Sequence, residues 1–444
     1  MRTAPRASPS PPSARLERGA RVGRGPAAGR RPRLKAIRTL ARHGRVGVPL
    51  LGVVPLSPKD LAPPSHPLER LPEEWAEVLV AWGQPKYRGI QVFRWIQQRG
   101  VFDAEQMTDL PKALREKLRE EGLDGSLPVE AARGSMATDR TRKLLVRLHD
   151  GKDVETVLIP QLEKDPDVED EDRDADRGTG LRPSDTVTQC ISSQVGCAMG
   201  CVFCASGVAG LQRHLSAAEI VGQVLLGRAT LEPQERLRNV VLMGMGEPLH
   251  NYEAVARTLV LLTHPDGIGL STRRVTVSTS GLVPQIDRLG QDFGGQVALA
   301  LSLHAVTDER RSSIMPINKK YPLAELVACL QRYPLPKRRR ITLEYTLIAG
   351  VNDDPKDADK LADLMKRVPV KVNLIPMNPI AESELNAPQW SGVERFAQRL
   401  RARGMTATVR KQRGNDVDAA CGQLALYGPS GERSARTRRL PVQK

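Results

Sequence analysis

Residues 186–204 read TVTQCISSQVGCAMGCVFC, a strand-like run that leads into three closely spaced cysteines. β-Branched residues at the start of this stretch favour a β-strand. The cysteines, Cys197, Cys201 and Cys204, follow a C-x3-C-x2-C spacing. The whole chain has only 6 cysteines in 444 residues, which is too few for a disulfide scaffold. Their crowding therefore predicts a metal site directly after a strand, in a reducing compartment.

Downstream of this stretch, strand-like runs alternate with amphipathic segments of helix length. Repeated βα units with buried strands predict a parallel sheet with right-handed crossovers. About six such units predict an α/β fold, a partial TIM-like (βα)6 barrel over residues 186–428, with its chemistry at the carboxyl ends of the strands. The strand-like runs are 186–195, 239–245, 274–280, 297–305, 340–349, 370–376 and 405–411.

The sequence upstream of the barrel divides into two regions. Residues 70–125 hold three of the 4 tryptophans, and their apolar residues recur at helical spacing, which predicts a small helical domain. Residues 126–185 predict a β-hairpin linker, in which Asp150-Gly151 suits a tight turn. An acidic insertion occupies residues 161–184 of this linker.

The net charge of +16 is concentrated at the two ends of the chain. Residues 1–50 hold 13 Lys or Arg and 1 acid, and residues 431–444 hold 5 Lys or Arg and 1 acid. We therefore expect a disordered basic tail at 1–69 and a basic arm at 429–444. The tail could bind RNA loosely, be dispensable, or act as an organelle transit peptide. No apolar run approaches the roughly 18 residues that span a bilayer, so we expect a cytoplasmic protein without a membrane partner.

The cysteine cluster allows two kinds of metal site. Three thiolates at this spacing can ligate three irons of one [4Fe–4S] cluster and leave the fourth iron open. Structural zinc is the alternative, but it takes four ligands, and no nearby residue completes a tetrahedron at the usual spacing. His214 lies in a polar stretch further along and is a poor fourth ligand.

Polar residues and glycines recur at the predicted carboxyl ends of the later strands. The second run ends in MGMGEP at 243–248. Glycines there allow close backbone approach to a ligand. Recurrence at the same end of successive strands favours a site over isolated turns. The residues concerned are Gly246, Glu247, Ser278, Ser302, Leu303, His304 and Asn378.

The three-cysteine motif, with an aromatic residue before the third cysteine, resembles the radical S-adenosylmethionine (radical SAM) superfamily, whose open iron chelates SAM. Two further stretches, CISSQVGC at 190–197 and DVDAACGQL at 416–424, closely resemble the RlmN/Cfr family of radical SAM RNA adenine methyltransferases, and RlmN most. The resemblance covers residues 70–428, and the segment 83–96 is similar to the RNA-engaging N-terminal part of that family. The acidic insertion departs from the family pattern.

The resemblance implies a methyl relay, because adenine C2 is electrophilic and cannot attack a SAM methyl group directly. Cys421 would take a methyl group from one SAM. A radical made from a second SAM on the cluster would remove hydrogen from that methyl group, which then adds to the ring. Cys190 would release the product through a transient disulfide with Cys421, and Glu155 would accept the proton. By resemblance, SAM is contacted by Gly246, Glu247, Ser278, Ser302, Leu303, His304 and Asn378.

The implied substrates are an adenine of 23S rRNA at the peptidyl-transferase centre and the adenine 3′ of the anticodon in some tRNAs, each presented as a splayed-out base. The resemblance also implies one [4Fe–4S] cluster, two SAM per turnover and an external one-electron reductant such as flavodoxin or ferredoxin. We expect a monomer. Alternatives are Cfr-type methylation of adenine C8 and, from a different class, a non-catalytic iron–sulfur RNA-binding factor for ribosome assembly. The presence of both Cys190 and Cys421 argues against the latter.

Overall fold

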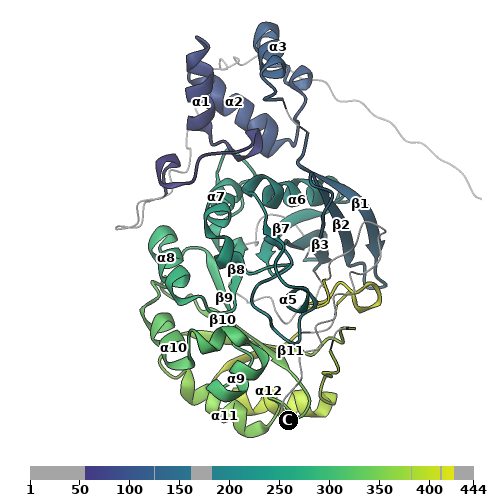
Figure 1. Cartoon of the computed structure of the whole chain (residues 1–444), viewed down its shortest axis with the longest axis vertical. Coiled ribbons are helices and arrows are strands. Elements are labelled where there is room, and N and C mark those ends of the chain that lie inside the picture. The colour runs from purple at the N-terminus through teal and green to yellow at the C-terminus, as the bar shows by residue number, and fades with distance from the viewer. Residues whose placement is uncertain (1–55, 125, 162–182, 382, 411–412, 425–444) are drawn as a thin grey trace, which may run out of the picture. The chain divides into compact units, whose positions relative to one another are not determined.

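A computed structural model describes residues 56–124, 126–161, 183–381, 383–410 and 413–424. Within these residues, ten strands form one sheet in the order β1-β2-β3-β4-β7-β8-β9-β10-β11-β12 (Figure 1). All neighbours from β4 to β12 in this order pair in parallel. The predicted α/β fold with a partial (βα)6 barrel is confirmed.

The parallel strands fall within or close to the predicted runs, and the central ones are buried on both faces, as crossover helices require. In β10, for example, Leu343 and Tyr345 on one face are 0% exposed, and Glu344 and Thr346 on the other are 6% and 8% exposed. The strands are β4 Thr186–Cys190, β7 Arg236–Leu242, β8 Val275–Thr279, β9 Ala298–Ser302, β10 Ile341–Leu347, β11 Val370–Pro376 and β12 Thr406–Val409.

Helices alternate with these strands and lie on the outside of the curved sheet (Figure 1). Helix α6 begins with a capping box, in which Ser216 Oγ accepts from Glu219 N at 3.1 Å and Glu219 Oε2 accepts from Ser216 N at 2.9 Å. Within the described residues, no helix is long and apolar enough to cross a bilayer. The main helices are α6 Ala217–Ala229, α7 Tyr252–Thr263, α8 Val283–Phe293, α9 Asp308–Ile314, α10 Leu323–Arg332, α11 Pro355–Leu364 and α12 Trp390–Ala402.

Three antiparallel strands extend the barrel sheet where a hairpin linker was predicted. They are β1 Val129–Met136, β2 Arg142–Leu148 and β3 Asp153–Pro160. Strand β3 pairs antiparallel with β4, and Val157 lies opposite Cys190 in that register. The region therefore belongs to the sheet rather than linking two domains. Residues 162–182, which hold most of the acidic insertion, lie outside the described residues.

The N-terminal helices are α1 Pro72–Ala81, α2 Tyr87–Phe93, a π-helix at Arg94–Gln98 and α3 Lys112–Glu120. Trp75 is 0% exposed and lies at the centre of this region. Ordered structure begins earlier than the predicted boundary at residue 70, because Leu68 and Glu69 are buried in a 3-10 turn. Glu69 Oε1 also accepts from Ala218 N of α6 at 2.9 Å. The remainder of the predicted tail, residues 1–55, and the predicted C-terminal arm lie outside the described residues.

Candidate active site

A pocket opens at the carboxyl ends of the parallel strands, where the fold predicts chemistry. Its free volume is about 910 Å³, including the part open to solvent. Most of the predicted site residues line it, although they come from distant parts of the sequence: Cys197, Cys201, Cys204, Gly246, Glu247, Ser278, Ser302, His304, Asn378 and Cys421.

The three motif cysteines lie between β5 (Gln194–Val195) and the start of α5 (Ala205–Ala209). Gly196 precedes them with φ +75°, and a Cβ there would lie 1.9 Å from the carbonyl oxygen of Gly210, so only glycine fits. All three thiols are free. Burial raises the pKa of Cys197 to about 12 and also raises the pKa of Cys201 and of Cys204. A coordinated metal would overcome this effect, because it deprotonates its thiol ligands outright.

Two kinds of metal site differ in what they ask of these thiols. Structural zinc is held by four ligands on one ion. In a [4Fe–4S] cluster each cysteine binds a different iron, so three cysteines can hold three irons. In the part of the chain that the structure describes, no three His, Cys, Asp or Glu side chains converge on one ion position.

Gly246 and Glu247 form the turn that follows β7. Gly246 has φ +106°, and a Cβ there would lie 2.6 Å from Cβ of Gln194. The Glu247 side chain is buried, and its carboxylate accepts from Ser280 N at 2.7 Å and from Leu249 N at 3.1 Å. Burial raises the pKa of Glu247, and these hydrogen bonds oppose the rise. A carboxylate offers about four acceptor sites, so Glu247 can still accept from a ligand.

His304 follows β9 and presents one defined donor to the pocket. Thr346 N donates to His304 Nδ1 at 2.9 Å, so the neutral ring carries its proton on Nε2. Burial, with a smaller effect of the Arg311 charge, lowers the pKa of His304 to about 3. Leu303, the predicted backbone contact, does not line the pocket, and its N–H already donates to the carbonyl oxygen of Glu344 at 3.1 Å. The structure therefore gives Leu303 no free N–H for a ligand.

Cys421 reaches the pocket from the C-terminal segment. Arg410 Nη1 lies 3.2 Å from Cys421 Sγ. Asn378 Nδ2 donates to the carbonyl oxygen of Cys421 at 3.0 Å. Ala205 N, directly after the cysteine motif, donates to the carbonyl oxygen of Gly422 at 2.9 Å. These contacts hold Cys421 beside the three motif cysteines.

Cys190 lies in a second pocket that shares a wall with the first. Cys421, Arg410 and Asn378 line both pockets, and Cys190 lines the second. Burial raises the pKa of Cys190 to about 12, and the nearby Cys421 acts in the same direction. The two thiols that the sequence predicts as disulfide partners therefore border one cavity, and both are free here.

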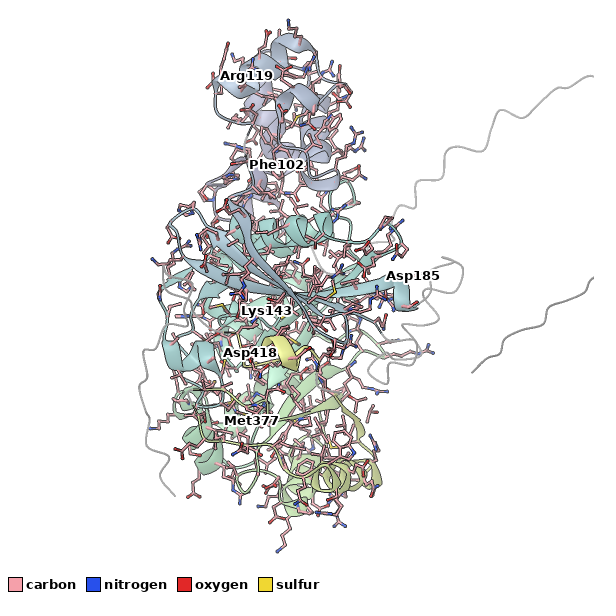
Figure 2. The ribbon with its side chains drawn as sticks, turned by 90° about the vertical axis from the view of Figure 1, so that its right-hand side faces the viewer. Phe102, Arg119, Lys143, Asp185, Met377 and Asp418 are labelled. Carbon is pink, nitrogen blue, oxygen red and sulfur yellow. The ribbon has the colours of Figure 1, made fainter. Side chains whose placement is uncertain are left out.

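Glu155 lies on β3 and is absent from the described walls of both pockets. Its side chain is 1% exposed, and Lys143 Nζ on β2 lies 2.8 Å from its Oε1. Lys143 also donates to the carbonyl oxygen of Asp418 at 3.2 Å, just upstream of Cys421. Figure 2 shows Lys143 and Asp418 side by side. The predicted proton acceptor is thus connected to the Cys421 segment through a buried lysine.

The predicted site residues did not include several polar residues of the pocket, among them Arg410, Ser280 and Glu344. Arg410 was placed inside the last predicted strand, but β12 ends at Val409. If the strand had been predicted to end at Val409, Arg410 would have been the first residue after it and would have been selected as a site candidate, as Asn378 was. Glu344 lies inside β10, where its side chain accepts from Asn373 Nδ2 at 2.9 Å, and no sequence signal distinguishes it from a structural carboxylate.

Two family models match the chain. Residues 191–362 match the radical SAM superfamily, and residues 71–122 match the ribosomal RNA large subunit methyltransferase N-terminal domain. A protein of Sorangium cellulosum named dual-specificity RNA methyltransferase RlmN is 60% identical over 377 residues, covering 82% of this chain and 96% of that relative. The chain belongs to the RlmN family.

Other RlmN-family relatives agree with this assignment. The protein of that name from Marinobacter nauticus is 44% identical over 370 residues, which cover 82% of this chain and 92% of the relative. A crystal structure of a radical SAM methyltransferase from Sphaerobacter thermophilus is 43% identical, with a TM-score of 0.71, and covers 81% of this chain and 99% of its own. The predicted family and the predicted radical SAM fold are confirmed.

The RlmN-family pocket has an unused polar group that suits a cofactor. Asn378 Oδ1 is buried without a hydrogen-bond partner among the described residues, and Asn378 lines the pocket. Unpartnered buried polar atoms are rare in native proteins. Together with three free thiols, this atom fits the iron–sulfur cluster and SAM that membership of the radical SAM superfamily implies.

Proposed function

We propose that this chain methylates C2 of an adenine in 23S rRNA at the peptidyl-transferase centre, and the adenine 3′ of the anticodon in some tRNAs. The names of the RlmN relatives support RNA as the substrate. One structural observation carries the mechanism: Cys421 lines both the pocket of the three motif cysteines and the pocket of Cys190. A thiol with access to both can accept a methyl group on one side and be resolved by a second thiol on the other.

The first pocket would hold the cofactors. Cys197, Cys201 and Cys204 would ligate one [4Fe–4S] cluster. When bound, the cluster and SAM supply the radical that breaks an unreactive C–H bond. Glu247 would accept a hydrogen bond from the SAM amino group. His304 would donate a hydrogen bond to SAM from its Nε2. The other proposed SAM contacts are Gly246, Ser278, Ser302 and Asn378.

Cys421 is the proposed methyl carrier. Its sulfur would bond to the methyl carbon of a first SAM as the carbon–sulfonium bond breaks, which leaves S-methylcysteine and S-adenosylhomocysteine. Arg410 lies within hydrogen-bond distance of this sulfur and stabilises negative charge on it. Asn378 holds the backbone of Cys421 in place. A second SAM would be consumed as the radical source, so each turnover uses two.

Cys190 and Glu155 are proposed to complete the reaction. Cys190, as thiolate, would attack Sγ of Cys421, so that a disulfide forms as the bond from sulfur to the transferred carbon breaks; the electron pair stays on that carbon, which takes up a proton and becomes the methyl group. Before that step the radical adduct would return one electron to the cluster, and Glu155 would accept the proton that leaves C2. Because Glu155 lines neither pocket, this transfer needs a relay, and the buried ammonium group of Lys143 is its neighbour. An external one-electron reductant, such as flavodoxin or ferredoxin, would reduce the cluster and, after turnover, the disulfide.

The test is a reconstituted assay on RNA. The full chain, loaded anaerobically with iron and sulfide, is incubated with SAM, a reductant and either a 23S rRNA fragment or total tRNA, and the nucleosides are analysed by mass spectrometry. We expect 2-methyladenosine, its loss in Cys421→Ala, and its retention in Cys329→Ala, whose thiol lies in α10 outside both pockets. Formation of 8-methyladenosine alone would show Cfr-type chemistry instead, and unmodified RNA from a cluster-loaded enzyme would contradict the proposal.

A further inference from the structure

Arg311, on α9, is completely buried beneath the cofactor pocket, with 0% of its surface exposed. Its guanidinium makes four hydrogen bonds to two strand ends and a neighbouring turn. Nη2 donates to the carbonyl oxygens of Ser280 at 2.6 Å and Ser302 at 3.1 Å. Nε donates to the carbonyl oxygen of Leu303 at 3.0 Å, and Nη1 donates to Asn318 Oδ1 at 3.0 Å. The side chain therefore ties the end of β9 to the turn after β8.

All four acceptors are neutral, which leaves the charge of Arg311 without a direct counter-ion in the described residues. The nearest carboxylate in this network, Asp308, accepts from Asn318 Nδ2 at 2.9 Å rather than from Arg311. A buried charge without a partner costs several kcal/mol. Burial lowers the pKa of Arg311 to about 10, and the anionic forms of Cys201 and Asp308 oppose this effect. The guanidinium therefore stays protonated at neutral pH.

The missing counter-charge matches what the motif cysteines would carry. Three thiols that ligate a cluster are thiolates, and they bring negative charge to the wall nearest Arg311. Backbone contacts support this proximity, because Val202 N, next to Cys201, donates to the carbonyl oxygen of Ile314 in α9 at 3.1 Å. Ser280 and Ser302, whose carbonyls Arg311 holds, both line the same pocket.

We propose that Arg311 is a positioning residue of the cofactor site: its hydrogen bonds fix the wall that faces SAM, and its charge compensates the thiolates that hold the cluster. This inference rests on the proposed function, since it requires a cluster in the pocket. It does not make Arg311 a SAM ligand, because Arg311 is absent from the described pocket wall.

Two substitutions separate the two roles. Arg311→Met removes both the charge and the hydrogen bonds, whereas Arg311→Lys keeps the charge but cannot reach four acceptors with one ammonium group. The matched control is Arg257→Met, because Arg257 is also an almost completely buried arginine. Arg257 lies on α7, forms an ion pair with Glu74 at 2.9 Å and does not line the pocket.

Each variant is purified anaerobically, and three quantities are measured: iron content, the midpoint potential of the cluster by EPR titration, and the SAM dissociation constant by equilibrium dialysis. In Arg311→Met we expect cluster retention or SAM affinity to fall about 10- to 100-fold, as for other residues that support metal ligands. The potential of any cluster retained should become more negative, because a nearby positive charge favours the added electron. Arg311→Lys should keep the potential of the unmodified protein but bind SAM more weakly.

Four outcomes decide the inference. Unchanged iron content, SAM affinity and potential in Arg311→Met would overturn it, and so would equal losses in Arg257→Met. If Arg311→Met does not fold, Arg311→Lys tests the role of the charge. A cluster potential in Arg311→Lys that differs from that of the unmodified protein would overturn this role. If the unmodified protein binds no cluster, the proposed function fails as well, and that failure is visible before any variant is measured.

Discussion

The buried pair of Lys143 and Glu155 gives the most quantitative prediction. The two charged atoms are 2.8 Å apart, and the side chains are 9% and 1% exposed. At an effective dielectric constant of about 20, this separation corresponds to about 6 kcal/mol of Coulomb attraction. Lys143→Met removes the ammonium group but leaves the Glu155 carboxylate buried. Because the buried carboxylate loses an ammonium group 2.8 Å away, we expect the free energy of unfolding to fall by about 3–5 kcal/mol.

The assay is anaerobic urea unfolding followed by circular dichroism, with a double-mutant cycle. The matched control is Lys152→Met, since Lys152 lies 3.7 Å from Asp150 at 39% exposure and should cost under about 1 kcal/mol. Adding Glu155→Leu to Lys143→Met should recover much of the loss, because no buried charge remains. A loss under about 1 kcal/mol in Lys143→Met, or no recovery in the double variant, would refute the assignment of a buried ion pair.

Three further predictions concern the site. Arg410→Met should slow alkylation of Cys421 by iodoacetamide severalfold, because it removes a positive charge 3.2 Å from the sulfur that contributes about 1.3 kcal/mol even in water-like surroundings, partly offset by the change in nucleophilicity; peptide mass spectrometry measures the rate, and an unchanged rate would exclude the contact. Cys190→Ala should accumulate a covalent RNA adduct on Cys421, visible as a slow band on a denaturing gel; free product at the normal rate would argue against a resolving thiol. The free energy of unfolding should fall as the pH is lowered from 6.5 to about 3, because His304 binds a proton in the unfolded chain but not in the folded chain, where its pKa is lowered to about 3. Urea unfolding at a series of pH values should show a smaller fall over this range in His304→Gln, and an equal fall would be contrary evidence.

The strand ends show how much of the site was predictable from the sequence. Strand boundaries depend on local patterns, so Ser278, Ser302 and Asn378 could be assigned to one rim of the sheet before any coordinates were known. The cysteine spacing predicts a metal site in the same way, because ligand spacing is a local property. Both inferences could be drawn without coordinates because residues near in sequence decide them.

Residues that act through long-range packing were not predictable in this way. Arg311 looks like one of several charged residues on a short amphipathic helix, and only the folded chain shows that its guanidinium is buried against two strand ends. Lys143 lies near the start of a strand as an ordinary charged residue, and its contact with Asp418 joins positions far apart in the chain. The tail boundary was misplaced for the same reason, because Glu69 is ordered by a contact with Ala218.

The central claim is that the transferred carbon passes through Cys421. Forming a carbon–carbon bond to adenine C2 requires that one C–H bond of the S-methyl group breaks first. With SAM that carries a fully deuterated methyl group, the relay therefore predicts 2-methyladenosine with two deuteriums in its new methyl group, measured by mass spectrometry of nucleosides after many turnovers. A product that retains all three deuteriums would mean direct methyl transfer and would contradict the account.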